Sequence, residues 1–168
     1  MTYRLAVTPG EPSGVGPELM YHLSKLDLKD TQLVIIASKE LIAQRIALFN
    51  SNHTESVKLI DYSKDNFVPQ TKGTLCVLDV PLAVPSVPGK LDKRNAKYVL
   101  DCLDIASDKS ESGEFSGIVT GPISKAVIAD TGLNFTGHTE YFQERTHTKK
   151  VVMMLGCKKF NVALATTH

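Results

Sequence analysis

Short apolar runs alternate with longer helix-like stretches along this chain, and this alternation constrains the fold more than any other feature. The runs are rich in Val, Ile and Leu, as is typical of strands buried on both faces. They give six candidate strands, at 4–8, 32–38, 74–80, 117–122, 150–156 and 160–167. The intervening segments carry helical spacing or helix-start signals, at 17–25, 39–49, 95–107, 123–131 and 141–146. The alternation predicts a doubly wound α/β fold around a sheet of mixed strand direction.

Composition narrows the class of ligand. The chain has 168 residues, 42% hydrophobic and 22% charged, which is enough to bury one sizeable core. Lys and Arg number 19 against 18 for Asp and Glu, without a long run of one sign, so nothing supplies the positive field that nucleic acid or an anionic membrane attracts. No apolar run approaches the roughly 20 residues of a membrane span, and the N-terminus lacks the apolar stretch of a signal peptide. We expect a small ligand and a cytoplasmic address.

The cysteines support a reducing compartment. Cys76, Cys102 and Cys157 are odd in number, far apart and in no CxxC pair. This pattern favours reduced thiols over a disulfide framework. We interpret all three as packing residues.

A glycine-rich segment, TPGEPSGVGPEL at 8–19, follows the first candidate strand and leads into a helix with Pro17 in its first turn. Open α/β sheets bind ligands at the carboxyl ends of their strands, and Gly10, Gly14 and Gly16 would let backbone amides approach an anion. The spacing is not that of the GxGxxG fingerprint, and two prolines in the segment remove amides. A rigid turn without a ligand is the equal alternative.

A second segment, GPISKAVI at 121–128, closes a strand and opens a helix with Lys125 near its start. A lysine at a helix N-terminus opposes the macrodipole, which invites a functional role such as phosphate or carboxylate binding. A solvated lysine is the simpler alternative.

The third segment, NFTGHTEYF at 134–142, places His138 and Thr139 directly after Gly137, at the expected start of another helix. Adjacent imidazole and hydroxyl groups beside free helix amides could hold a phosphate or a hydroxyl-bearing substrate. The alternative is a capped helix in which Thr136 or Thr139 satisfies backbone amides and His138 is an incidental surface residue.

The last candidate strand ends in His168, and a histidine at that position is well placed to bind a metal or carry a proton. One histidine does not complete a metal site. His22, His53 and His147 lie in helical or polar loop contexts without ligand spacing, and we interpret them as surface residues.

Together, the segments TPGEPSGVGPEL, GPISKAVI, TGHTEYF and MMLG followed by ALATTH resemble the PdxA family in order and spacing, over essentially the whole chain. The resemblance implies a two-lobed α/β fold like that of isocitrate and isopropylmalate dehydrogenases, here truncated to roughly its N-terminal half. Residues 1–125 would form most of the first lobe, with the glycine-rich loop at 8–19. Residues 126–168 would begin the second lobe, which dimerises and binds metal.

The resemblance also implies an activity and a set of roles. His138 and Thr139 match the family's substrate-binding pair, and His168 matches the first of three histidines that hold a divalent metal, with zinc expected before magnesium or cobalt. The family binds NAD, or NADP, without the GxGxxG fingerprint, and the resemblance assigns no cofactor contact to this part of the chain. Lys125 as a catalytic charge or proton partner is a conjecture from its position at the helix start.

The implied reaction is the NAD-dependent oxidation, with decarboxylation, of 4-phosphohydroxy-L-threonine to 3-amino-2-oxopropyl phosphate in pyridoxal 5'-phosphate synthesis. The metal would lower the pKa of the substrate hydroxyl. We expect a homodimer when the protein is intact, and an inactive fragment when it is not. Two alternatives remain open: a related dehydrogenase of phosphorylated four-carbon sugar acids, and a non-catalytic phosphate-binding fragment.

Overall fold

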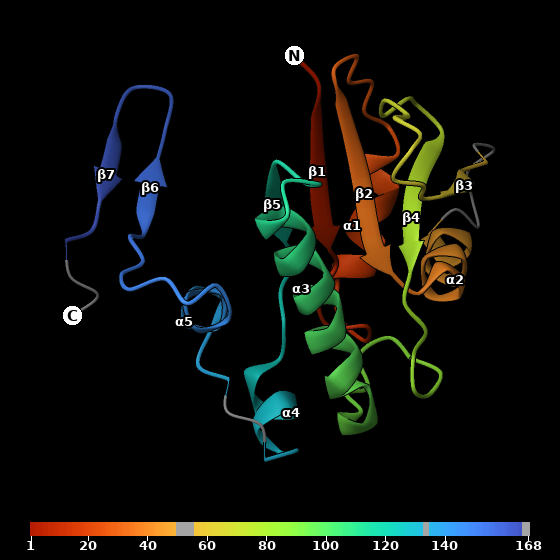
Figure 1. Ribbon diagram of the computed structural model, residues 1–168. Coiled ribbons are helices and arrows are strands. Elements are labelled where there is room, and N and C mark those ends of the chain that lie inside the picture. Colours follow the sequence, from red (N-terminus) through yellow and green to blue (C-terminus); the bar gives the residue numbers. More distant parts are fainter. Residues whose placement is uncertain (50–55, 133–134, 166–168) are drawn as a thin grey trace.

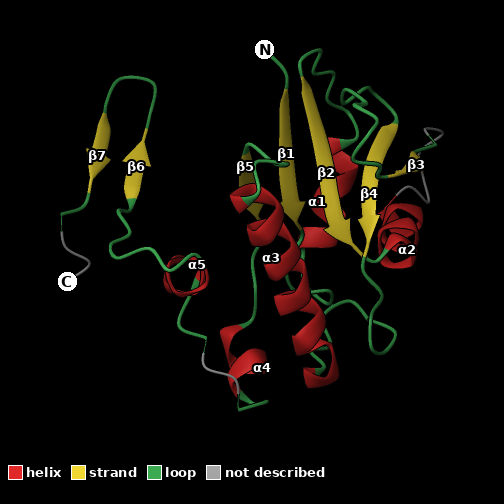
Figure 2. Cartoon of the chain, in the orientation of Figure 1, coloured by secondary structure: helices red, strands yellow, loops and turns green. Residues whose placement is uncertain are grey.

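One parallel sheet organises most of the chain. The computed structural model describes residues 1–49, 56–132 and 135–165. Within these residues, five strands pair in the order β3-β4-β2-β1-β5, and helices cover both faces of their sheet (Figures 1 and 2). The strands are β1 (Tyr3–Thr8), β2 (Thr31–Ala37), β3 (Lys58–Asp61), β4 (Thr74–Asp79) and β5 (Gly117–Thr120).

The helices lie on opposite faces, which confirms the doubly wound prediction. Helices α1 (Gly16–Leu23) and α2 (Lys39–Phe49) share a hydrophobic cluster with Leu33 and Ile35 of β2. Helix α3 (Ala96–Glu111), which follows a short 3-10 turn at Lys93–Asn95, packs on the other face. Because side chains alternate along a strand, β2 fills both layers, and its apolar run is continuous.

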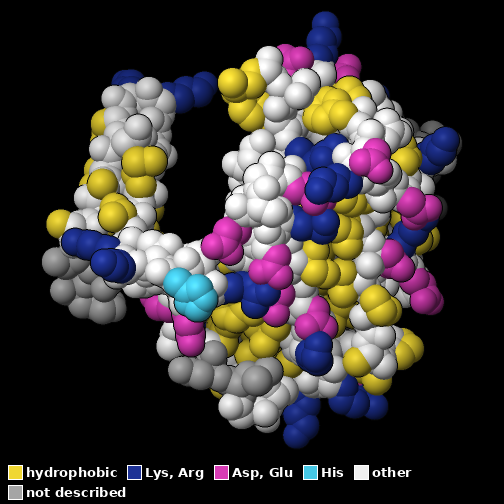
Figure 3. All heavy atoms as spheres, in the orientation of Figure 1, with side chains coloured by type: hydrophobic (Ala, Val, Ile, Leu, Met, Phe, Trp, Pro, Cys, Tyr) yellow, Lys and Arg dark blue, Asp and Glu magenta, His cyan; other side chains and the backbone are white. Residues whose placement is uncertain are grey.

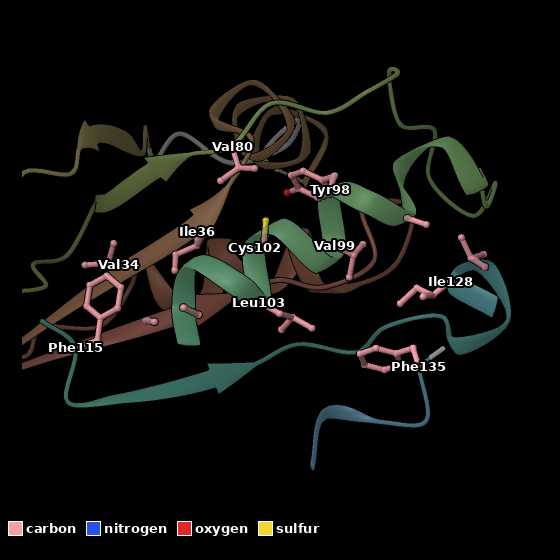
Figure 4. Packing of buried hydrophobic residues seen from close by; sticks show 14 of the residues in the cluster. Val34, Ile36, Val80, Tyr98, Val99, Cys102, Leu103, Phe115, Ile128 and Phe135 are labelled. Atoms are coloured by element: carbon pink, nitrogen blue, oxygen red, sulfur yellow. The ribbon is translucent and has the colours of Figure 1, made fainter. Parts of the chain in front are cut away.

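Figure 4 shows the layer beneath α3. Val34 and Ile36 of β2 point toward Tyr98, Cys102 and Leu103 of the helix. All of these side chains are buried. The same cluster includes Val127, Ile128 and Phe135, which follow the sheet in sequence, so the chain beyond β5 stays anchored to this core.

The predicted mixture of strand directions is wrong for this sheet. All four strand pairs, β1–β2, β1–β5, β2–β4 and β3–β4, are parallel. Helices α1, α2 and α3, and a loop between β3 and β4, return the chain to the same edge before each new strand begins. Antiparallel neighbours would instead need direct hairpin connections.

The last two strands form a separate structure. Strands β6 (Met154–Gly156) and β7 (Asn161–Ala163) pair as an antiparallel hairpin. Figure 3 shows this hairpin standing away from the body with open space between them. Every residue of both strands is exposed, so the expectation of buried strands at 150–156 and 160–167 is wrong. A two-stranded hairpin has no second layer to cover it.

Other predictions differ in detail. Strand β3 was missed because its two central apolar residues, flanked by Lys58 and Asp61, give little signal. Buried Cys76 and Cys102 confirm two packing cysteines, but Cys157 is exposed beside β6, so its packing role is wrong. No helix among the described residues is long and apolar enough to cross a membrane.

Candidate functional site

The carboxyl ends of the five strands lie at one edge of the sheet, where α/β folds bind ligands. The connection after β1 leads to one side of the sheet, and β5 lies on its other side, so the strand order reverses between these two strands. At this reversal the glycine-rich loop after β1 meets the Gly-Pro turn after β5. The sequence predicted both segments as candidate sites.

The glycines of the first loop allow its backbone to touch the neighbouring turn. A Cβ on Gly10, which has φ +83°, would lie 2.2 Å from the carbonyl oxygen of Pro122. A Cβ on Gly16 would lie 1.7 Å from the carbonyl oxygen of Pro9, and one on Gly121 would lie 2.3 Å from the same oxygen. These contacts are impossible for any residue with a side chain. Gly10 and Gly121 therefore serve close packing between the two turns, and Gly16 serves close packing within the first loop.

The loop also uses its amides internally. The amide of Glu11 donates to the Pro122 carbonyl at 2.9 Å, and the amide of Gly14 donates to the Glu11 carbonyl at 3.0 Å. The buried Glu11 carboxylate accepts from the Ser13 amide at 3.0 Å. An anion would have to displace these partners. The contacts favour a rigid turn over an anion-binding loop.

A buried arginine secures this turn from below. Arg45 of α2 is 2% exposed and lies 3.2 Å from the Glu18 carboxylate. Its guanidinium also donates to the Pro12 carbonyl at 2.8 Å and to the Ser86 hydroxyl at 3.3 Å. Sequence analysis missed this role, because an arginine within a helical stretch is most often exposed. The glycine-rich loop is thus fixed by tertiary contacts on two sides.

Lys125 begins α4 (Lys125–Ala129), as the sequence predicted, and Ser124 caps the helix by accepting from the Val127 amide at 3.4 Å. The lysine is exposed, and its Nζ reaches toward the start of the next helix. A Cβ on Gly137 would lie 3.6 Å from that nitrogen. The two segments singled out in the sequence, 121–128 and 134–142, therefore meet at Gly137.

His138 begins α5 (His138–Arg145) with Gly137 as the N-cap. No side chain in the described part of the chain caps this helix, so the alternative of a threonine cap is wrong. The imidazole is edge-on to Phe135, with ring centroids 6.1 Å apart, and stacks on Phe142 at 6.3 Å. These contacts fix the ring direction and leave Thr139 beside it in the first turn.

One ring nitrogen of His138 is free to bind a ligand. Its Nε2 is buried and has no hydrogen-bond partner among the described residues. Burial lowers the pKa of His138, and the nearby charge of Lys125 lowers it further. The imidazole is therefore neutral near pH 7 and carries one donor and one acceptor nitrogen. A bound phosphate or hydroxyl group would supply the hydrogen bond that this buried nitrogen lacks, and a phosphate would also pair with the nearby lysine.

The proposed metal ligand, His168, lies outside the described residues, as does His53. Among the described residues, no group of three or more His, Cys, Asp or Glu side chains could hold a metal ion. His22 and His147 are exposed, which confirms their surface position.

Comparisons with known proteins identify the family of this chain. The profile of a family described as pyridoxal phosphate biosynthetic protein PdxA matches residues 29–168. The chain belongs to the PdxA family.

Individual relatives carry a more specific name. The 4-hydroxythreonine-4-phosphate dehydrogenases of Colwellia psychrerythraea and Chromobacterium violaceum are 47% and 50% identical to this chain, over 100% and 98% of it. A crystal structure of the Klebsiella pneumoniae enzyme of that name superimposes on 97% of the chain with a TM-score of 0.85 and 25% identity. The chain spans about half the length of these relatives, 50%, 48% and 49% respectively.

Proposed function

We propose that this chain supplies part of the substrate site of a 4-hydroxythreonine-4-phosphate dehydrogenase. The reaction would be the NAD-dependent oxidation, with decarboxylation, of 4-phosphohydroxy-L-threonine to 3-amino-2-oxopropyl phosphate in pyridoxal 5'-phosphate synthesis. The observation that carries the proposal is the buried Nε2 of His138, which lies beside Lys125 and has no hydrogen-bond partner among the described residues, in a chain of the PdxA family.

The geometry suggests how these residues act on such a substrate. Neutral His138 would donate or accept one hydrogen bond at Nε2, and the Thr139 hydroxyl would offer a second contact in the same turn. Lys125 would bring a positive charge toward a phosphate or carboxylate, as the conjecture from its position supposed. The residues would therefore bind and orient the substrate.

The cofactors would come from elsewhere. NAD, or NADP, would accept the hydride, and a divalent metal with His168 among its ligands, zinc before magnesium or cobalt, would polarise the reacting oxygen. The described residues present no set of ligands for the metal. The packed glycines of the first loop do not favour a dinucleotide there.

The architecture of a longer protein belongs to the same proposal. We infer an isocitrate dehydrogenase-like fold with a lobe boundary near residue 125, and a homodimer in which the second lobe makes the contact. Exposed apolar side chains on β6 and β7 support a covered face there: Met154, Leu155 and Val162. A cytoplasmic location and the absence of nucleic acid or membrane partners stay predictions.

Joining this chain to the second half of the Chromobacterium violaceum relative would test the activity. The fusion should oxidise 4-phosphohydroxy-L-threonine with NAD, whereas the 168-residue chain alone should show no turnover. Replacing His138 with Ala should lower kcat/KM about 10- to 100-fold, the value of a hydrogen bond to a charged group. The exposed His147→Ala variant is the matched control and should retain activity.

The same fusion separates the alternatives. Preference for a phosphorylated four-carbon sugar acid would replace the proposed substrate with the related one. A folded fusion that turns over neither compound would support a non-catalytic phosphate-binding role. Full activity in the His138→Ala variant would remove the proposed site itself.

A further inference from the structure

Helix α5, which carries His138 and Thr139, has little apolar burial to hold it in place. None of its residues is fully buried, and Tyr141 and Phe142 are half-buried against the core. Non-directional packing of two rings leaves a short helix free to rotate or slide over a neighbouring one. A fixed position therefore needs directional contacts.

Such contacts come from two carboxylates on α3. Asp104 and Asp108 are four residues apart and so lie on one face of that helix. Asp104 accepts a hydrogen bond from the Tyr141 hydroxyl and lies 2.9 Å from Nη1 of Arg145. Asp108 accepts three hydrogen bonds from Arg145, one from Nε at 3.0 Å and two from Nη2, both at 2.8 Å.

The two carboxylates are not equivalent. The side chain of Asp104 is 32% exposed, whereas that of Asp108 is 60% exposed. Asp108 is the more exposed partner and contacts the arginine alone, so it holds α5 at a single point and is more weakened by solvent. Asp104 binds both the tyrosine and the arginine, which are four residues apart on α5. Two anchors on one helix fix its rotation as well as its distance.

The tyrosine connects this anchor to the candidate site. Tyr141 follows His138 by three residues, so the two side chains are neighbours on the helix surface. The Tyr141 ring contacts the Phe135 ring, with centroids 5.3 Å apart, and His138 lies edge-on to the same Phe135 ring. Any shift of Tyr141 would therefore move the ring against which His138 is set.

We propose that Asp104 is a positioning residue: through Tyr141 and Arg145 it holds α5 in one setting against α3 and so fixes the place of His138 and Thr139. The functional meaning of this inference rests on the substrate-binding role proposed above. The claim that Asp104 positions α5 does not rest on that role, and it can be tested in the 168-residue chain without substrate.

The test measures the titration of the His138 ring by NMR in the unaltered chain and in three variants. Tyr141→Phe removes the hydroxyl, Asp104→Asn removes the charge, and Asp108→Asn alters the outer partner of the same arginine. Displacement of α5 would expose His138 and separate it from Lys125 of α4. We expect the His138 midpoint to rise toward the ordinary value of 6.5 in the first two variants and to stay unchanged in the third.

Thermal unfolding of each variant separates positioning from simple stability. A merely structural role would lower the melting temperature and leave the midpoint of the folded state where it was, and that result in Tyr141→Phe would overturn the proposal. An equal shift in Asp108→Asn would also overturn it. The mild Tyr141→Phe change decides the matter even if Asp104→Asn does not fold. Exposed His22 and His147 are internal references.

In the fusion enzyme, the Tyr141→Phe and Asp104→Asn variants should raise KM more than they lower kcat, because the binding pair is displaced. An inactive fusion would count against the proposed function. The NMR titration would still decide the positioning role.

Discussion

The sheet and the β6–β7 hairpin are built from similar apolar runs, but the strands of the sheet are largely buried and those of the hairpin are exposed. Strand β2 is buried along nearly its whole length between α1 and α2 on one face and α3 on the other. Strands β6 and β7 are exposed throughout, although Met154, Leu155 and Val162 are as apolar as the residues of β2. The difference shows that an apolar run becomes a core strand when two layers of helices cover it.

The largest expected contrast is in thiol reactivity. In the native chain a thiol reagent should modify Cys157 at once, whereas Cys76 and Cys102 should react when the body unfolds. Burial raises the pKa of the Cys102 thiol to about 12, which further suppresses its thiolate. With a typical domain stability of ~5 kcal/mol or more, the rates should differ about a thousandfold or more. Mass spectrometry of timed reactions measures them.

Comparable rates for the three thiols would contradict the difference in burial between the two regions. Labelling in denaturant, where all three are accessible, provides the control.

A matched pair of substitutions tests the energetic side of the comparison. Leu75 of β4 is 0% exposed and Leu155 of β6 is 61% exposed. Leu75→Ala should lower the free energy of unfolding by about 2–5 kcal/mol, because it leaves a cavity in a packed core. Leu155→Ala makes the same chemical change and should cost about 0.5 kcal/mol or less. Urea titration followed by circular dichroism measures both.

Equal losses in the two variants would show that the hairpin is packed against something in solution. Dilution of the sample then distinguishes a second copy of the chain from contact within one copy.

A smaller contrast concerns charges. In the body, the Glu114 side chain is 6% exposed and accepts hydrogen bonds from Tyr62 at 2.6 Å and Lys109 at 2.8 Å. Burial alone would raise the pKa of Glu114, but these bonds and the lysine charge outweigh it and lower the pKa. A carboxyl group whose pKa is lower in the folded state than in the unfolded state stabilises the fold at pH values above the unfolded pKa. This stabilisation is lost as the pH falls through the folded pKa.

Glu114→Gln should therefore cost about 1 kcal/mol of unfolding free energy at pH 7, since the amide still accepts hydrogen bonds. The gap to the unaltered chain should narrow below pH ~4.5, where the unfolded carboxyl takes up a proton. In the hairpin, Lys159→Gln should change stability little at any pH. Urea titrations at several pH values make the comparison, and a gap that widens toward low pH would contradict the assigned pKa direction.

Local sequence signals predicted much of the fold and part of the candidate site. Helix α2 begins and ends at the residues that its helical spacing predicted. Helix α4 begins within the segment that follows the predicted Gly-Pro turn. Lys125 and His138 were each singled out from their positions at helix starts. Such signals are local, because turns, caps and periodicity involve residues close in sequence.

Other features were missed because they depend on residues far apart in the chain. Arg45 is buried beneath the glycine-rich loop through contacts with residues 27 to 41 positions away. The glycines of that loop suggested a ligand, and instead they admit the carbonyl groups of another turn. A glycine pattern indicates that another group approaches the backbone closely, but it does not distinguish a ligand from a neighbouring part of the chain.

The sequence by itself determined the alternation of strands and helices, the approximate positions of most elements and the family of the chain, because these depend on local pattern and motif. The tertiary structure alone decided that all five strands of the sheet are parallel, that β6 and β7 stay uncovered, and that Lys125 reaches the start of α5. It also decided that Asp104 meets Tyr141 across 37 positions. These outcomes depend on which surfaces meet after folding, and burial and charge pairing between distant residues select them.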